Sequence, residues 1–444
     1  MKKTQLALVG AGKIGEAIAT LLGETGDYHL TVIDRDENRL GAFRDAGFQV
    51  QSCDLDAAVD LAPLMSGQQM AISACPYHLT PVIAAAAKAA GAHYFDLTED
   101  VESTRAVKRL AQGADTAFVP QCGLAPGFIS IAAHSATRDF ESLRDLRMRV
   151  GALPIFPSNA LKYNLTWSTD GLINEYCNPC EAIVDGQLRE VPALEEVEEF
   201  SLDGLNYEAF NTSGGLGTLC ETLAGRVDNL NYKTVRYPGH RDIIKILIRD
   251  LRLGMHRQLL KDVLEAAIPM TAQDLVLIFV TVTGQKGGRL TQETFVRKVY
   301  GKEVGGKYLS AIQLTTAAGI CAMVDLMVEG KLARRGFIRQ EQVSLDTFLD
   351  NRFGRFYAIE DAAKRSVSAM APRATQRSLR HERLPLVTGP GRPLSAGVVG
   401  RVACKTELDN CIQYTILDNQ PVSAMLLPDR KTRSVRSQEK ETSS

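Results

Sequence analysis

Three glycines near the start of the chain have the spacing of a dinucleotide-binding turn. The apolar run Leu6–Val9 ends in Gly10, Gly12 and Gly15, a G-x-G-x-x-G pattern that opens into a helix-like segment. The first glycine permits a tight turn, the second lets the backbone approach a pyrophosphate, and the third lets the helix pack closely on the sheet. The pyrophosphate then lies over the helix N-terminus, whose unpaired N–H groups face it. We predict that the whole turn binds the cofactor, including Ala11, Lys13 and Ile14.

An acidic residue follows a second apolar run at the distance at which such sites bind a ribose. The run Leu30–Ile33 ends in Asp34, about 20 residues beyond the glycines. A carboxylate there accepts hydrogen bonds from the ribose hydroxyls and repels a 2′-phosphate, which favours NAD over NADP. Arg35 follows at once and could stack on adenine or bind that phosphate, so NADP is the alternative. Asp54, after a third strand-like run, is predicted to contact the adenine or to be a solvated loop acid.

The first part of the chain alternates between strand-like and helix-like segments. Strand-like runs at 5–9, 30–34, 48–53, 70–73, 93–96 and 117–121 predict an α/β fold with a doubly wound parallel sheet. Ligands bind beyond the carboxyl ends of the strands in such sheets. Strand-end residues are therefore candidates for the site, namely Ala74, Cys75, Pro76, Tyr77, Asp96, Cys122 and Gly123.

The pattern changes after Gly127. From 145 to about 300 the strands alternate in polarity and are linked as hairpins, with Asp185-Gly186 at the centre of one pair. A second pair, 275–283 and 292–300, flanks a Gly-rich turn. These patterns predict a second, α+β domain with a mixed, largely antiparallel sheet.

Two polar stretches of this second part could bind a small charged molecule. The stretch Tyr232–Arg241 places Arg236 and His240 around a Pro-Gly turn, and arginine suits bidentate recognition of a carboxylate. The Gly-rich stretch Asn211–Gly217, which includes Thr212, could wrap a small anionic or zwitterionic substrate. A solvated strand end and a flexible connector are the alternative interpretations.

Other patterns exclude several kinds of chemistry. Cys177 and Cys180 form a C-x-x-C, but a second ligand pair at metal spacing is lacking and the motif precedes a hairpin, so we expect no metal. A G-x-S-x-G elbow is also lacking, which argues against a hydrolase. The net charge of −1 gives no reason to expect nucleic acid as a partner, and no apolar run predicts a membrane span. Nine scattered cysteines fit the reduced thiols of a cytoplasmic protein.

The end of the chain differs in composition from the rest. Residues 358–444 hold 14 Lys and Arg against 9 Asp and Glu, with poor periodicity and frequent Pro, Ser and Arg. This composition predicts a basic tail that is mostly disordered or loosely docked, with a short strand-like run at Cys411–Leu417.

Seven motifs occur in the order in which the saccharopine dehydrogenase family carries them, and the chain resembles that family from about residue 4 to Tyr357. They lie at 10–15, 74–77, 94–98, 122–127, 164–176, 208–212 and 234–240. The resemblance implies a Rossmann domain at 1–125, a substrate-binding and dimerisation domain at 126–330, and a segment at 331–357 that returns to the first domain. It further implies a homodimer or homotetramer. The tail at 358–444 matches nothing in the family.

The resemblance also implies an NAD(P)-dependent oxidoreductase of amino-acid degradation that acts on CH–NH₂ or CH–NH donors. Carried over by position, the glycines and Asp34 hold the cofactor, and 74–77 lie along its nicotinamide half. Asp96, Cys122 and Gly123 then face the substrate, and Arg236 binds its carboxylate.

The amine of the substrate must lose a proton before a hydride can leave the neighbouring carbon. Because the ε-amine of lysine has a pKa of about 10.4, a general base is needed, and Asp96 and His240 are both candidates. The resemblance at 174–176 and 237–240 implies free lysine as the substrate, oxidised to the 6-semialdehyde with release of ammonia. Saccharopine is the alternative, and its larger acidic end would need a cationic pocket, for which Lys162 and Arg241 are available. An NAD-binding sensor or assembly protein is the non-enzymatic alternative.

Overall fold

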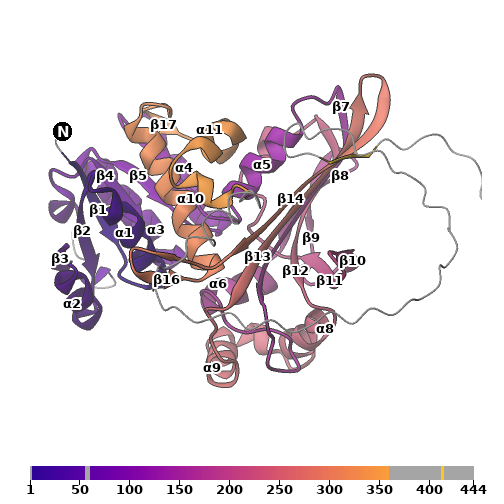
Figure 1. Cartoon of the computed structure of the whole chain (residues 1–444), viewed down its shortest axis with the longest axis horizontal. Helices are drawn as coiled ribbons and strands as arrows, with labels where there is room; N and C mark the ends of the chain where they lie inside the picture. Colours follow the sequence, from indigo (N-terminus) through magenta and orange to yellow (C-terminus); the bar gives the residue numbers. More distant parts are fainter. Residues whose placement is uncertain (1–2, 56–60, 360–411, 415–444) are drawn as a thin grey trace, which may run out of the picture.

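The computed structural model describes residues 3–55, 61–359 and 412–414, which form two large β-sheets that lie side by side (Figure 1). The first sheet has seven parallel strands in the order β17-β6-β5-β4-β1-β2-β3. Its strands are β1 (Thr4–Val9), β2 (Tyr28–Asp34), β3 (Gln49–Ser52), β4 (Met70–Ser73), β5 (His93–Asp96), β6 (Ala117–Val119) and β17 (Gly336–Phe337). This is the predicted doubly wound sheet, extended by one short strand from late in the chain.

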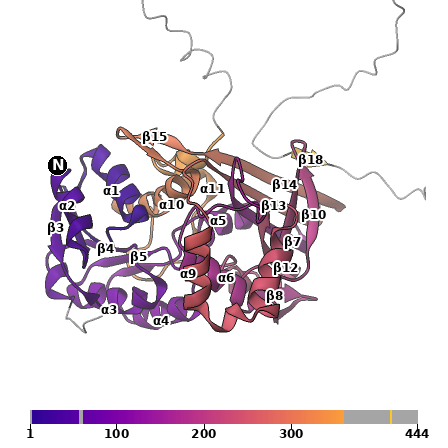
Figure 2. The same ribbon diagram turned by 90° about the horizontal axis from the view of Figure 1, so that it is seen from below.

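Helices cover both faces of the first sheet, which explains why β1 and β4 are almost entirely buried apolar runs. Figure 2 shows α1 and α10 on one side of the sheet and α3 and α4 on the other. The helices are α1 (Lys13–Thr25), α2 (Glu37–Asp45), α3 (Thr80–Ala90) and α4 (Val101–Ala111), with short 3₁₀ turns at Pro63–Met65 and Tyr77–Leu79. The strand order reverses between β1 and β4, and ligands of such sheets bind at this point.

The second sheet has nine strands and is mixed. Its main path runs β10-β11-β12-β7-β13-β14-β18, while β8 pairs with β12 and β9. Only β12 and β7 are parallel neighbours; the other pairs are antiparallel. The strands are β7 (Ser142–Pro154), β8 (Cys180–Val184), β9 (Gln187–Val191), β10 (Glu198–Leu202), β11 (Leu205–Asn211), β12 (Val227–Arg236), β13 (Asp274–Lys286), β14 (Arg289–Tyr300) and β18 (Ile412–Tyr414).

Two hairpins of this sheet were predicted from turn residues. Asp185 and Gly186, both at positive φ, connect β8 and β9 as expected. The β13–β14 hairpin is longer than predicted, because only Gly287 and Gly288 form the turn and the preceding Gly-Gln-Lys stays in the strand. A two-stranded sheet follows, β15 (Lys302–Val304) with β16 (Lys307–Leu309).

The helices of the second part lie around one side of the mixed sheet and between the two sheets (Figures 1 and 2). They are α5 (Phe128–Ala136), α6 (Thr169–Cys177), α7 (Leu219–Thr222), α8 (His240–Lys245), α9 (Arg257–Ala267), α10 (Ala311–Val328) and α11 (Leu345–Asp350). A π-helical turn at Ile246–Asp250 and 3₁₀ turns at Leu253–Met255, Gln340–Gln342 and Gly354–Tyr357 complete them.

Helix α10 is the central core element. By length and composition it could span a membrane, but 83% of it is buried inside this fold, where it packs on α1 and β13. Ser310 and Gln313 form a capping box at its start. The buried Asp274 carboxylate also accepts hydrogen bonds from the N–H groups of Ala311 and Ile312, at 2.5 and 3.0 Å. The apolar sequence of α10 is therefore that of a helix buried between two layers.

The segment after α10 lies against the first sheet. Its β17 extends that sheet beside β6. Arg352 forms an ion pair with the buried Asp325 of α10, at 2.7 Å, and Asp325 also accepts a hydrogen bond of 2.6 Å from the Tyr28 hydroxyl of β2. Tyr357 stacks on Phe128 of α5 with ring centroids 3.9 Å apart. The predicted tail lies outside the described residues, apart from 358, 359 and the strand β18, which pairs with β14.

Candidate active site between the two sheets

The turn between β1 and α1 has room only for glycine at two of its three positions. A Cβ atom on Gly10, whose φ is +109°, would lie 2.6 Å from the carbonyl oxygen of Ala74, and one on Gly15 would lie 2.0 Å from the carbonyl oxygen of Gly10. Gly12 caps α1 without any side-chain hydrogen bond, and only Arg39 approaches its Cβ position, at 3.9 Å. The N-terminus of α1 therefore presents open N–H groups, and the turn fits a pyrophosphate.

The flanking residues of the turn connect it to its surroundings. The Lys13 ammonium lies 2.9 Å from the Met270 sulfur of the second part of the chain, and Ile14 packs on the main core. The N–H of Ala11 donates a hydrogen bond of 2.6 Å to the Asp34 carboxylate, whose other oxygen accepts one from Asp36 at 2.9 Å. The predicted ribose acid is thus fixed directly against the glycine turn.

The other predicted adenine-side residues lie at the surface. Arg35 and Asp54 are both more than half exposed, and their charged groups are 3.8 Å apart. Arg39 pairs with Asp36 at 3.2 Å. Two arginines therefore lie near the end of β2, beside the carboxylate of Asp34.

The residues predicted along the nicotinamide half follow β4. Ala74 donates its N–H to Val9 at 2.8 Å, and the Cys75 sulfur lies 3.2 Å from the Cβ position of Gly10. Pro76 is exposed, and Tyr77 begins a 3₁₀ turn in which its carbonyl accepts a hydrogen bond of 3.1 Å from Ser103. This segment therefore borders the glycine turn at the strand reversal.

Asp96 ends β5 and is almost fully buried, at 1% exposed. One of its carboxylate oxygens accepts hydrogen bonds from the N–H groups of Thr98 and Gln121, at 3.0 and 2.9 Å. The other oxygen has no hydrogen-bond partner in the part of the chain that the structure describes. Burial raises the pKa of Asp96 to about 6. The side chain thus holds the backbone that follows β5 and β6.

Cys122 presents its backbone rather than its thiol to the strand-end edge. The buried thiol donates to the carbonyl of Val119 at 3.0 Å and lies 3.2 Å from the Gln340 amide, and burial raises its pKa well above the usual range. Gly123 is equally confined, because a Cβ there would lie 3.2 Å from the carbonyl oxygen of Pro126.

Arg236 at the end of β12 is 2% exposed and belongs to a buried aromatic network. Its Nε donates to the Tyr176 hydroxyl at 3.0 Å, and its guanidinium lies 4.9 Å from the ring centroid of Tyr163. The Tyr176 hydroxyl also lies 3.0 Å from Nε2 of His240, whose Nδ1 is 3.0 Å from the carbonyl oxygen of Leu161. Since a carbonyl can only accept, Nδ1 carries the proton and Nε2 accepts from Tyr176.

This network determines the protonation state of the His240 ring. The side chain is fully buried, and burial together with the nearby Arg236 charge lowers its pKa to about 3. His240 is therefore neutral, and both of its ring nitrogens already have partners. In this arrangement it orients Tyr176, and through Tyr176 it orients Arg236.

The predicted loop Asn211–Gly217 joins the two parts of the site. Ser213 donates its N–H to the carbonyl of Glu175 in α6 at 3.1 Å, and the Cβ position of Gly217 lies 3.1 Å from the Gln121 side chain. The Asn211 amide donates to Pro192 at 3.3 Å. The side-chain oxygen Oδ1 of Asn211 and the Thr212 hydroxyl are buried without hydrogen-bond partners among the described residues. Such atoms indicate a bound polar group or water.

Two acidic residues of the site were not predicted from the sequence. Glu99 follows β5, and Glu175 lies in α6 and is 6% exposed. Burial raises the pKa of Glu99 to about 7, with Asp100 and Asp96 adding to the effect. Burial also raises the pKa of Glu175 to about 8; Arg236 opposes this rise and Glu99 adds to it. The sequence signal for Glu175 was its place in the motif at 164–176.

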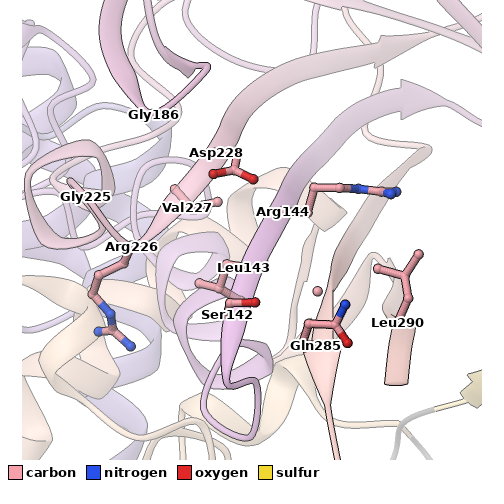
Figure 3. A pocket seen from close by; sticks show the side chains of 11 residues that line it. Ser142, Leu143, Arg144, Gly186, Gly225, Arg226, Val227, Asp228, Gln285 and Leu290 are labelled. Carbon is pink, nitrogen blue, oxygen red and sulfur yellow. The ribbon is translucent and has the colours of Figure 1, made fainter. Parts of the chain in front are cut away.

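Two pockets lie outside this cluster. Figure 3 shows one of about 440 Å³ between the first residues of β7 and β12 and the β13–β14 hairpin, which includes none of the predicted site residues. Another, of about 490 Å³, borders α6 and reaches the cluster only through Tyr176. Cys177 and Cys180 are free thiols, and the described residues contain no group of His, Cys, Asp or Glu side chains suited to a metal ion.

The glycine turn and the fixed acid after β2 are those of a dinucleotide-binding domain, and the buried polar cluster belongs to the second part of the chain. Residues 6–119 match the saccharopine dehydrogenase NADP binding domain, and residues 123–351 match the saccharopine dehydrogenase C-terminal domain. The chain therefore belongs to the saccharopine dehydrogenase family, which confirms the resemblance of its motifs.

One solved structure shows the same fold over most of its length. The chain is similar to apo saccharopine dehydrogenase (L-Glu forming) from Saccharomyces cerevisiae, at 16% identity and a TM-score of 0.65, over 78% of this chain and 95% of that chain. A putative myo-inositol dehydrogenase from Sinorhizobium meliloti 1021 aligns at 13% identity and a TM-score of 0.39, over 83% and 98% of the two chains. The first likeness shows a shared fold, and the second is too distant to support an argument.

Proposed function

We propose that the protein is an L-lysine 6-dehydrogenase. A hydride passes from the ε-carbon of L-lysine to NAD, and water hydrolyses the resulting imine to ammonia and the 6-semialdehyde, which cyclises to piperideine-6-carboxylate. The proposal goes beyond family membership and depends on the charges that the buried cluster presents.

The observation that carries the proposal is the isolation of Arg236. Its side chain is 2% exposed, yet among the described residues no carboxylate oxygen lies within 4.0 Å of its guanidinium. Its hydrogen bonds go to a tyrosine hydroxyl and a backbone carbonyl. Glu175 is near enough to interact with Arg236 but does not form a direct ion pair with it. A buried guanidinium without a direct ion pair is costly, so the site favours a ligand that brings a carboxylate to Arg236.

The remaining charges favour lysine over saccharopine. Asp96, Glu99 and Glu175 are acidic, which suits a substrate with two amines and disfavours one with extra carboxylates. Saccharopine would need a cationic pocket, but neither Lys162 nor Arg241 offers a free buried charge for one. Lys162 is exposed and donates to the carbonyl of Pro238 at 2.6 Å, while Arg241 is neutralised by Asp242 at 2.6 Å and Glu195 at 3.1 Å.

NAD fits the first part of the site. Gly10, Gly12 and Gly15 would hold its pyrophosphate at the start of α1, and Asp34 would accept the adenosine ribose hydroxyls and repel a 2′-phosphate. Arg35 and Arg39 are the groups that would favour NADP instead. When bound, the nicotinamide ring supplies the acceptor for the hydride of the substrate.

The direct test follows the absorbance of the reduced cofactor. The purified protein is mixed with NAD or NADP and with L-lysine or saccharopine, and released ammonia and glutamate are assayed. We expect reduction of NAD with lysine and stoichiometric ammonia. Glutamate release from saccharopine without lysine oxidation would establish the alternative substrate, and NAD binding without reduction by either compound would support a sensor.

A further inference from the structure

Glu99 and Glu175 belong to different parts of the chain and meet at helix α6. The Glu99 carboxylate lies 3.3 Å from the Cβ position of Gly171, where the Trp167 ring is closer still, at 2.4 Å. Gly214 makes room for the Glu99 backbone, because a Cβ there would lie 2.6 Å from the Glu99 carbonyl oxygen. Glu175 follows Gly171 by four residues and therefore projects from the same face of α6, one turn further along. The two carboxylates are thus neighbours.

Neither carboxylate has a direct partner among the described residues. Across residues 3–55 and 61–359, neither side chain forms an ion pair or a hydrogen bond with another residue. Glu175 is 6% exposed and Glu99 is half-buried, and carboxylates held largely away from solvent without a direct partner favour a cationic ligand. A cationic group of the substrate would satisfy both.

The charged groups follow one another in a fixed order. Asp96 ends β5 three residues before Glu99, whose carboxylate lies near the Gly171 position of α6, and Arg236 donates to Tyr176, the residue after Glu175. The order from the first sheet to β12 is therefore Asp96, Glu99, Glu175, Arg236. Extended lysine has the complementary order, with its ε-amine at one end, its α-ammonium near the other end and its carboxylate beside that ammonium.

We propose that Glu175 binds the α-ammonium group of the substrate and that Glu99 is the base that takes the proton from its ε-ammonium group. This inference rests on lysine as the substrate. In the proton transfer one N–H bond of the ε-ammonium breaks, its electron pair stays on nitrogen, and the proton binds a carboxylate oxygen of Glu99.

Glu99 is better suited than either base predicted from the sequence. His240 is neutral but offers no free nitrogen, because Leu161 and Tyr176 occupy both. Asp96 accepts two backbone hydrogen bonds, which stabilise its anion and weaken it as a base. Glu99 has no such donors from other residues, and its pKa of about 7 matches a base that works near neutral pH.

The role of Glu175 is tested with a substrate that lacks the α-amine. For Glu175→Gln, kcat/KM is measured with L-lysine and with 6-aminohexanoate, and compared with the wild type and with Glu190→Gln, a change at an exposed acid of β9. We expect the preference for lysine over 6-aminohexanoate to fall about 10- to 100-fold in Glu175→Gln only, as the loss of a charged hydrogen bond predicts. An equal loss with both substrates would mean a structural role and overturn the assignment.

The role of Glu99 is tested with Glu99→Gln and Glu99→Asp. We expect Glu99→Gln to lower kcat for lysine about 10²- to 10⁴-fold with KM changed only a few-fold, and to abolish the fall of kcat at acidic pH. Glu99→Asp should keep that fall and recover part of the rate. The groups that influence this titration are Asp96, Asp100, Glu175 and Arg236.

If the kcat of Glu99→Gln still falls at acidic pH, the inference is overturned. Failure of the inference is distinct from failure of the proposed function. If the wild type does not oxidise lysine, the function is wrong. If it does but the variants behave like the wild type, only the roles of Glu99 and Glu175 are wrong.

Discussion

The carboxylate of Asp34 and the N–H of Ala11 form a hydrogen bond of 2.6 Å, which ties the end of β2 to the glycine turn after β1. The acid that would bind the ribose and the turn that would bind the pyrophosphate are thus one rigid unit. A change at Asp34 therefore affects the position of the turn as well as the charge beside the ribose.

We expect Asp34→Ala to raise the KM for NAD about tenfold or more, since a charged hydrogen bond to the ribose is lost, and to affect NADP much less. The repulsion of the 2′-phosphate disappears in this variant while Arg35 and Arg39 stay. Steady-state kinetics with both cofactors measure the effect, and Asp45→Ala, at an exposed acid of α2, is the matched control. Equal loss for NAD and NADP would refute the preference for NAD.

Replacing Arg236 should act on substrate binding. We expect Arg236→Ala to raise the KM for lysine about 30-fold or more, because removing one partner of a buried charge pair costs about 2–5 kcal/mol. Arg236→Lys should recover only part of the affinity, because the ammonium group of a lysine side chain cannot form the paired hydrogen bonds that the planar guanidinium forms with a carboxylate. Arg241→Ala, where the side chain is already neutralised, should leave the KM for lysine unchanged. An unchanged KM in Arg236→Ala would remove Arg236 from the site.

The neutral state of His240 gives a prediction for the pH dependence of the rate. With a pKa of about 3, His240 does not titrate between pH 5 and 8. His240→Asn, which can keep the donor toward Leu161, should raise the KM for lysine about tenfold through Tyr176 and Arg236 and leave the pH profile of kcat in place. Loss of the acidic limb in this variant would show instead that His240 is the base.

The raised pKa of Glu175 makes the stability of the cofactor-free protein depend on pH. Between its ordinary value of 4.5 and its folded value of about 8, the folded state keeps a proton that the unfolded state releases. The free energy of unfolding therefore falls as pH rises through this range, by up to about 1.4 kcal/mol per pH unit for one group. Glu99 acts in the same direction up to about pH 7, and His240 acts in the opposite direction below 6.5.

Thermal unfolding between pH 6.5 and 8 isolates this effect, because His240 contributes little there. We expect the unfolding temperature of the wild type to fall more steeply over this range than that of Glu175→Gln, while Glu190→Gln follows the wild type. Identical slopes for all three proteins would show that Glu175 is ionised in the folded state.

Much of this fold was predictable because its signals are local. The glycines at 10–15 and the apolar runs at regular spacing predict a doubly wound sheet without any knowledge of tertiary contacts. Asp185-Gly186 likewise identified a hairpin. The strand β17 has only two residues, which is too short for a pattern of alternating polarity. It forms because it pairs with β6, a contact that the sequence does not show.

The site was less predictable because its chemistry depends on burial. Glu99 and Glu175 are distant in sequence, and only the docking of the β5–α4 loop against α6 makes them neighbours. Nor does the sequence show that the Cys122 thiol turns toward the carbonyl of Val119 or that both nitrogens of His240 are occupied. Residue type predicted which groups could react, while packing determined their protonation and orientation.

The late segment that adds β17 to the first sheet also has a consequence for the order of folding. Gln340 of this segment donates to the carbonyl of Pro120 at 2.7 Å, and Arg352 bonds Asp27 at 2.6 Å, so residues from both ends of the fold complete the nucleotide-binding domain. On the ribosome this domain emerges first, yet its last strand is translated only after the entire second domain. The nucleotide-binding domain therefore reaches its final form only when the domain with the mixed sheet has already been made.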